Sequence, residues 1–189
     1  MKCCNRELPS PEIIEGTAYF VCPECGMVRE KRNYQTYEID ECFSLFQEKY
    51  GFVLPNEYVS FSNSKKTMVI KLPPCNNKLL EYYFGDGFYE IGTVASLDPN
   101  SEDSIYHFVS TGREWGLPNS YVPIEGDGHT WLALDFGCSP ADPKVVVTET
   151  DAGNSLIVAN SFNEFLSSLL EYEEVYNIDG NIIYKEKAT

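Results

Sequence analysis

The sequence predicts an α+β fold, in which helices and antiparallel strands occupy separate parts of the chain. Three observations favour this class: two adjacent helical patterns at 39–62, a series of short β-prone segments from 67 to 158, and a further helical pattern from 161. A parallel sheet of βαβ units would need a regular alternation of strands and helices, which this order lacks. The 189 residues are enough for one full domain with a small addition.

Residues 1–37 differ from the rest of the chain because they hold four of its seven cysteines: Cys3, Cys4, Cys22 and Cys25. Two β-prone runs, 17–22 and 27–37, are joined by Cys22-Pro23-Glu24-Cys25-Gly26. This arrangement resembles a zinc knuckle, in which the glycine lets the backbone turn toward the sulfurs. We therefore expect a small Cys-rich β-hairpin at the N-terminus.

The cysteine spacing leaves three interpretations of this segment open. The 17 residues between Cys4 and Cys22 suit two zinc half-sites, whereas the adjacent Cys3 and Cys4 do not readily point at one ion. The segment is therefore a structural zinc site with four cysteine ligands, a degenerate ribbon that has lost its metal, or a segment with ordinary thiols. A structural zinc ion would stabilise a segment too small to bury its own core.

The patterns at 39–62 indicate a helical hairpin. One apolar stripe with helical spacing consists of Ile39, Cys42, Phe43, Phe46 and Tyr50. Gly51 follows as the expected left-handed C-cap, and Pro55 suits the first turn of a second, short helix. We expect that second helix to pack against the first through Tyr58, Val59 and Phe61.

After residue 66 the pattern changes to β-prone segments with one helix among them. The expected strands are 67–72, 79–84, 89–97, 121–124, 129–136, 143–148 and 154–158, and the expected helix is 101–115. In the segment 129–136 both alternating sets of side chains are largely apolar. This strand is therefore expected to be central in its sheet.

A closing helix is expected from Ser161, because Ser161-Phe162-Asn163-Glu164 has the form of a capping box. Its buried stripe is expected to comprise Phe162, Phe165, Leu166, Leu169 and Leu170. An Asp-Gly pair at 179–180 predicts a turn in a terminal hairpin over 176–184. The chain is thus divided into a Cys-rich segment at 1–37, a main domain at 38–175 and a hairpin tail at 176–189.

The chain is strongly acidic. Fourteen Lys and Arg against 29 Asp and Glu give a net charge of −15, and the segment 86–174 carries sixteen acidic residues against only Arg113 and Lys144. This balance disfavours binding to nucleic acids and to anionic membranes, which both require cationic side chains. The acidity either keeps the surface soluble or forms a negative face that steers a basic partner.

The cellular location is expected to be the cytoplasm. The N-terminus has no apolar stretch of the signal-peptide type, and no apolar run approaches the length that spans a bilayer. The odd number of cysteines argues against a complete disulfide framework and suits a reducing compartment.

The sequence points to no catalytic residues. It lacks the phosphate-binding, zinc-protease and nucleophile-elbow motifs, and the only imidazole bases are His107 and His129. A set of Cys138, His129 and Asp135 would suit acyl transfer. However, His129 and Asp135 lie about 20 Å apart along one strand. We therefore expect no enzyme.

The order of three motifs resembles the SUKH superfamily, the Smi/Knr-like proteins. The run 46–61, with Leu54-Pro55, Tyr58 and Phe61, is similar to the helical opening of that family. Pro123-Ile124-Glu125-Gly126-Asp127-Gly128 resembles its acidic turn, and Ala159-Asn160-Ser161-Phe162-Asn163-Glu164-Phe165-Leu166 resembles its ending. The sequence departs from the family where Ser62-Asn63-Ser64-Lys65-Lys66 replaces an Asn-Gly-Gly loop. The Cys-rich segment and the tail also lie outside the common pattern.

The resemblance implies a single α+β domain that binds other proteins, since bacterial members of the family often neutralise toxins as immunity proteins. We expect a basic toxin as the cognate partner, held on an acidic surface that blocks its active site. Charge and loop position, not a family site, suggest Glu114, Trp115, Glu125, Asp127, His129 and Asp135 as partner-binding residues. Two alternatives are a zinc-ribbon adaptor that acts as a scaffold without a toxin and, less favoured, a small hydrolase that uses His129.

Overall fold

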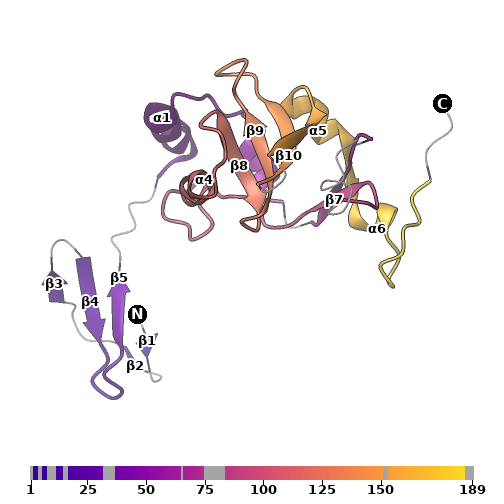
Figure 1. Cartoon of the computed structure of the whole chain (residues 1–189). Helices are drawn as coiled ribbons and strands as arrows, with labels where there is room; N and C mark the ends of the chain where they lie inside the picture. The colour runs from indigo at the N-terminus through magenta and orange to yellow at the C-terminus, as the bar shows by residue number, and fades with distance from the viewer. Residues whose placement is uncertain are drawn as a thin grey trace. The chain divides into compact units, whose positions relative to one another are not determined.

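The computed structural model describes residues 2–3, 6–7, 12–14, 17–31, 37–64, 66–74, 84–150 and 153–185. The chain divides into two compact units, Met1–Tyr37 and Glu38–Thr189, which are described separately (Figure 1). No helix in the described ranges is long and apolar enough to cross a membrane.

The first unit contains short antiparallel strands. They are β1 (Lys2–Cys3), β2 (Arg6–Glu7), β3 (Glu12–Ile14), β4 (Thr17–Val21) and β5 (Val28–Lys31). Strands β1 and β2 pair with each other, and the other three form a sheet in the order β3-β4-β5. The hairpin of β4 and β5 closes where Val21 faces Val28, so the cysteine turn joins two strands as expected.

The second unit begins with the expected helical hairpin, α1 (Ile39–Tyr50) and α2 (Tyr58–Ser62). Gly51 has φ of +78° and its N–H donates to the carbonyl of Gln47, which confirms the predicted C-cap of α1. The aromatic rings of α2 pack against the closing helix. The ring centroids of Phe61 and Phe165 lie 5.4 Å apart, and the Tyr58 hydroxyl donates to the carbonyl of Ala95 at 2.6 Å.

Two antiparallel sheets follow. One has the order β12-β6-β7 and contains β6 (Met68–Lys71), β7 (Phe88–Ile91) and β12 (Leu169–Glu171). The other has the order β11-β10-β9-β8 and contains β8 (Tyr121–Gly126), β9 (Thr130–Asp135), β10 (Lys144–Glu149) and β11 (Asn154–Ala159). These elements and the helices confirm the predicted α+β class.

The described residues also form the helices α4 (Ile105–Glu114), α5 (Phe162–Ser168) and α6 (Tyr172–Val175). Helix α4 packs against β8, whereas β7 and α6 lie toward the other end of this unit (Figure 1). Strand β9 lies between β8 and β10, and its residues Trp131–Leu134 are buried. The prediction that 129–136 is a central strand is therefore confirmed.

The predicted closing helix is too long. Helix α5 ends at Ser168, and Leu169–Glu171 instead form β12, which pairs with β6. Leu170 packs on a second apolar cluster that contains Val69, Phe88, Val175 and Tyr176. The leucines fit a helical stripe in the sequence, but an extended backbone here pairs with the hydrogen-bonding groups of β6 while Leu170 remains partly buried.

Other boundaries also differ from the predictions. Helix α4 starts at Ile105 because Ser104 is its N-cap and its side chain accepts from the backbone N–H of His107. Strand β7 ends at Ile91, before Gly92. The tail forms a turn at 177–180 with one bridge between Tyr176 and Ile182, so it is shorter than a full hairpin. The predicted strand 79–84 lies, except for Phe84, outside the described residues.

Candidate functional site

The turn between β8 and β9 is built around the side chain of Asp127. Its Oδ1 atom accepts hydrogen bonds from the backbone N–H groups of His129 at 2.9 Å and Thr130 at 2.8 Å. Gly126 leaves no room for a side chain, since a Cβ atom there would lie 2.5 Å from the carbonyl oxygen of Thr130. Gly128 has φ of +101°, a conformation that favours glycine. The turn therefore holds one carboxylate in a defined place.

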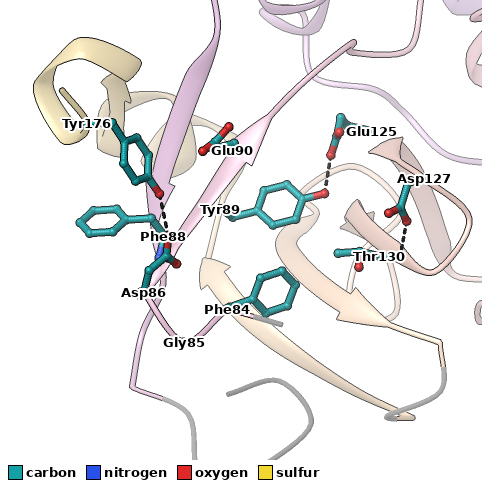
Figure 2. A pocket seen from close by; sticks show the side chains of 10 residues that line it. All are labelled: Phe84, Gly85, Asp86, Phe88, Tyr89, Glu90, Glu125, Asp127, Thr130 and Tyr176. Carbon is teal, nitrogen blue, oxygen red and sulfur yellow. Dashed lines mark hydrogen bonds between the residues drawn. The ribbon is translucent and has the colours of Figure 1, made fainter. Parts of the chain in front are cut away.

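A pocket of about 410 Å³, called the large pocket below, opens between this turn and β7. Its walls are aromatic and acidic, and the residues that line it are Phe84, Gly85, Asp86, Phe88, Tyr89, Glu90, Glu125, Asp127, Thr130 and Tyr176. Figure 2 shows how these side chains lie around the opening. Four acidic residues from two separate chain segments line this pocket, and no Lys, Arg or His occurs among the described residues of the lining.

Two tyrosine hydroxyls hold two of these carboxylates (Figure 2). Tyr89 donates to Oε2 of Glu125, and Tyr176 donates to Oδ2 of Asp86 at 2.9 Å. Burial raises the pKa of both phenols, and the neighbouring carboxylates add to the effect. The hydroxyls therefore stay protonated and continue to act as donors at neutral pH.

The two acidic residues of the turn differ in their protonation chemistry. Burial raises the pKa of Glu125, although hydrogen bonds from Tyr89 and from the Gly92 backbone oppose this shift. For Asp127 partial burial also acts to raise the pKa, but the hydrogen bonds from the backbone N–H groups of Thr130 and His129 outweigh it and lower the pKa. The carboxylate of Asp127 is therefore stabilised in its ionised form, whereas the ionised form of Glu125 is destabilised by burial.

A second pocket of about 240 Å³, called the small pocket below, lies between the same turn and α4. Its lining is mainly aromatic and consists of His107, Phe108, Thr111, Trp115, Gly126, Asp127, Gly128 and Trp131. Trp115 is 47% exposed, and its ring centroid lies 4.8 Å from that of His129. Trp131 is only 2% exposed and belongs to the core.

The structure brings together four of the six residues that charge and loop position suggested. Trp115, Asp127 and His129 lie around the small pocket, and Glu125 lines the large one. Asp135 lies at the opposite end of β9, where its Oδ1 accepts from the backbone N–H of Gly137 at 2.8 Å. Glu114 is exposed at the end of α4 and lines neither pocket.

The remaining residues of the large pocket were missed by sequence reasoning. Asp86, Tyr89 and Glu90 belong to or precede β7, and Tyr176 follows α6, some ninety positions later in the chain. The Gly85-Asp86-Gly87 run is typical of a turn but does not mark a site. No local signal marks Tyr176, because its role depends on a contact with Asp86 that only the tertiary fold creates.

The suggested acyl-transfer set is not assembled. The His129 ring packs against Trp115 at one end of β9, and Cys138 is an exposed residue three positions beyond Asp135 at the other end. The length of the strand therefore separates His129 from both Asp135 and Cys138.

The cysteine turn is described only in part. The N–H of Cys22 donates to the carbonyl of Met27 at 2.9 Å, that of Gly26 donates to the carbonyl of Cys22 at 2.8 Å, and Gly26 has φ of +67°. This tight turn suits a zinc half-site with Cys22 and Cys25 as ligands. The side chain of Cys3 and all of Cys4 lie outside the described residues, so the four-cysteine zinc site stays a prediction.

Comparison with known proteins identifies the second unit. The model of the SMI1 / KNR4 family (SUKH-1) matches residues 40–168, which is more than half of the chain. This range begins in α1, includes the β8–β9 turn and ends with α5. No match was found among curated proteins or among solved structures. The chain therefore belongs to the SMI1 / KNR4 family (SUKH-1).

Proposed function

We propose that this chain is a protein-binding module of the immunity type, which neutralises a cognate toxin in the cytoplasm by covering it with an acidic surface and performs no catalysis. Family membership supports the general class. The observation that carries the proposal is the large pocket, in which Asp86, Glu90, Glu125 and Asp127 converge without a basic side chain among its described lining residues.

The physical basis is charge complementarity. A toxin that acts on nucleic acids must itself be cationic to hold its substrate, so an acidic surface can attract it and occupy the same groove. The net charge of −15 supports attraction at a distance, and the aromatic rings around the pocket supply contact area once the partner has docked. Together these features favour occlusion over chemical modification of the partner.

The proposal is tested with the toxin domain that we expect a neighbouring gene to encode. Co-expression of the chain with that domain in a bacterial host should restore growth. A variant with Glu90→Gln and Asp127→Asn should lose most of the protection, because it removes two charges while it keeps the side-chain shapes. Asp135→Asn is the matched control and should protect as the unmodified chain does. Absence of protection, or equal protection by all variants, would contradict the proposal.

Salt dependence gives a second test of the same mechanism. The dissociation constant measured by calorimetry should rise at least tenfold between about 0.05 M and about 0.5 M NaCl, since screening weakens attraction between surface charges. A dissociation constant that does not change with salt would mean that apolar contacts, not the acidic surface, hold the partner.

A zinc-ribbon adaptor is the second candidate, favoured by the tight turn at Cys22–Gly26. Protein purified without chelators should contain one zinc ion per chain by elemental analysis, and Cys22→Ser with Cys25→Ser should abolish it. Absence of zinc in the unmodified protein would remove this candidate. If zinc is bound and the chain also neutralises the toxin, the zinc ion stabilises the first unit and the second unit binds the toxin.

A further inference from the structure

The small pocket has the size of one side chain. Its volume is about 240 Å³, whereas pockets for drug-sized ligands start at roughly 300 Å³. It lies between α4 and the β8–β9 turn, so its two walls come from segments that the fold holds against each other. A partner could therefore insert a single residue here, beside the larger contact surface.

The wall of this pocket contains an exposed aromatic ring with a fixed orientation. The rings of His129 and Trp115 pack edge to face, with an angle of 66° between their planes. A Cβ atom at Gly128 would lie 3.6 Å from the Trp115 ring, so the glycine allows the turn to approach the indole closely. An aromatic face held in this way attracts a cation placed over it.

Asp127 supplies a negative charge at the same place. Its Oδ1 atom is engaged by two backbone N–H groups of the turn, and the lowered pKa keeps the carboxylate ionised at neutral pH. It is the only carboxylate among the described residues that line the small pocket. A cation in this pocket would meet one carboxylate and one indole face.

The third feature is a buried donor. Trp131 lines this pocket, and its indole N–H is buried with no hydrogen-bond acceptor among the described residues. A buried donor without an acceptor destabilises the fold, so a ligand that brings a carbonyl oxygen gains affinity. A peptide segment can bring both a cationic side chain and a backbone carbonyl.

We infer that the small pocket accepts one arginine side chain of a basic partner protein, with its guanidinium on Trp115 and Asp127. Arginine fits better than lysine because its guanidinium is planar, weakly hydrated and able to stack on an indole while it hydrogen-bonds to a carboxylate. The acidity of the segment 86–174, in which Arg113 and Lys144 are the only Arg and Lys residues, favours such a cationic occupant. This inference rests on the proposed function, since it names the residue type that the partner presents.

The test uses the whole chain and a simple probe. The chain contains only two tryptophans, so a ¹⁵N-labelled sample gives two indole N–H signals, which Trp115→Phe assigns. We expect N-acetyl-arginine methylamide to shift both signals in a saturable way at pH 7.5. The lysine analogue should bind several-fold more weakly. The citrulline analogue, which has nearly the same shape without the charge, should bind more weakly still.

Two aspartate variants complete the test. Asp127→Asn keeps an oxygen that accepts from the turn N–H groups, yet it should weaken arginine binding at least threefold; Asp135→Asn should leave it unchanged. The remaining amide signals report that each variant is folded. Absence of saturable shifts, equal binding of arginine and lysine, or unchanged binding by Asp127→Asn would overturn the inference. Because no toxin is used, failure here is distinguishable from failure of neutralisation in the co-expression experiment.

Discussion

The two ends of β9 carry aspartates that each accept from backbone N–H groups of a turn but have different surroundings. Asp127, before the strand, accepts from backbone N–H groups two and three positions later, and Asp135, at its end, accepts from the N–H of Gly137. Asp127 lines two pockets: β7 borders the large pocket and α4 borders the small pocket. Asp135 lines neither pocket, and Lys144 is its neighbour in register on β10.

The difference shows that a short acidic turn motif does not by itself indicate a binding site. Both aspartates stabilise a turn, which is a common structural role of aspartate and does not indicate binding. Only at Asp127 do other segments add carboxylates and aromatic rings, and only Asp135 has a lysine opposite it in the sheet. The following predictions, ordered by size of effect, test how far the two ends differ.

The largest expected difference between the two ends is in the free energy of unfolding that is lost when a glycine there is replaced by alanine. Gly126→Ala should lower the free energy of unfolding by about 2–3 kcal/mol, because the new Cβ atom would clash with the backbone carbonyl of Thr130 and the ring of Trp131. Gly137→Ala should cost less than about 1 kcal/mol, since the nearest atom, 3.0 Å away, is the side-chain oxygen of Asp135, which can move. Urea denaturation of both variants measures the difference, and equal losses would mean that the turn at Gly126 relaxes freely.

Removal of the aspartates should have a smaller effect. Asp127→Ala loses two hydrogen bonds to an exposed carboxylate and should cost about 1 kcal/mol, whereas Asp135→Ala loses one and should cost about half as much. The lowered pKa of Asp127 means that its ionised form contributes stability above the ordinary pKa of about 4. That contribution is lost as the pH falls through the folded-state pKa, so the cost of Asp127→Ala should shrink in acid. A cost that does not vary with pH would show that the charge plays no part.

The smallest expected effect is a gain in stability at Glu125. Burial raises its pKa, so the ionised side chain destabilises the fold at neutral pH, and the penalty disappears as the pH falls below the ordinary pKa. Glu125→Gln should therefore raise the urea midpoint slightly at pH 7 and leave it unchanged near pH 4, while it weakens toxin binding. A lowered midpoint at pH 7 would mean that the hydrogen bond from Tyr89 outweighs the cost of burial.

Local sequence signals predicted several elements well. The end of α1 at Gly51 followed from the left-handed preference of glycine, and the start of α5 followed from its capping residue, since the Ser161 side chain accepts from the N–H of Glu164. The end of α5 did not follow, because Leu169 and Leu170 suit either a helix or a strand. Pairing with β6, a partner a hundred residues earlier, decided between the two.

The sequence by itself determined the α+β class, the acidic character, the family and the turn of the candidate site, because each depends on composition or on residues close together in the chain. The tertiary structure alone decided which acidic residues share a pocket. Asp86, Glu90 and Tyr176 join Glu125 and Asp127 only when β7 lies across the pocket from the β8–β9 turn and Tyr176 contacts Asp86. The physical reason is that electrostatic and packing interactions act over a few ångströms in space, whatever the separation along the chain.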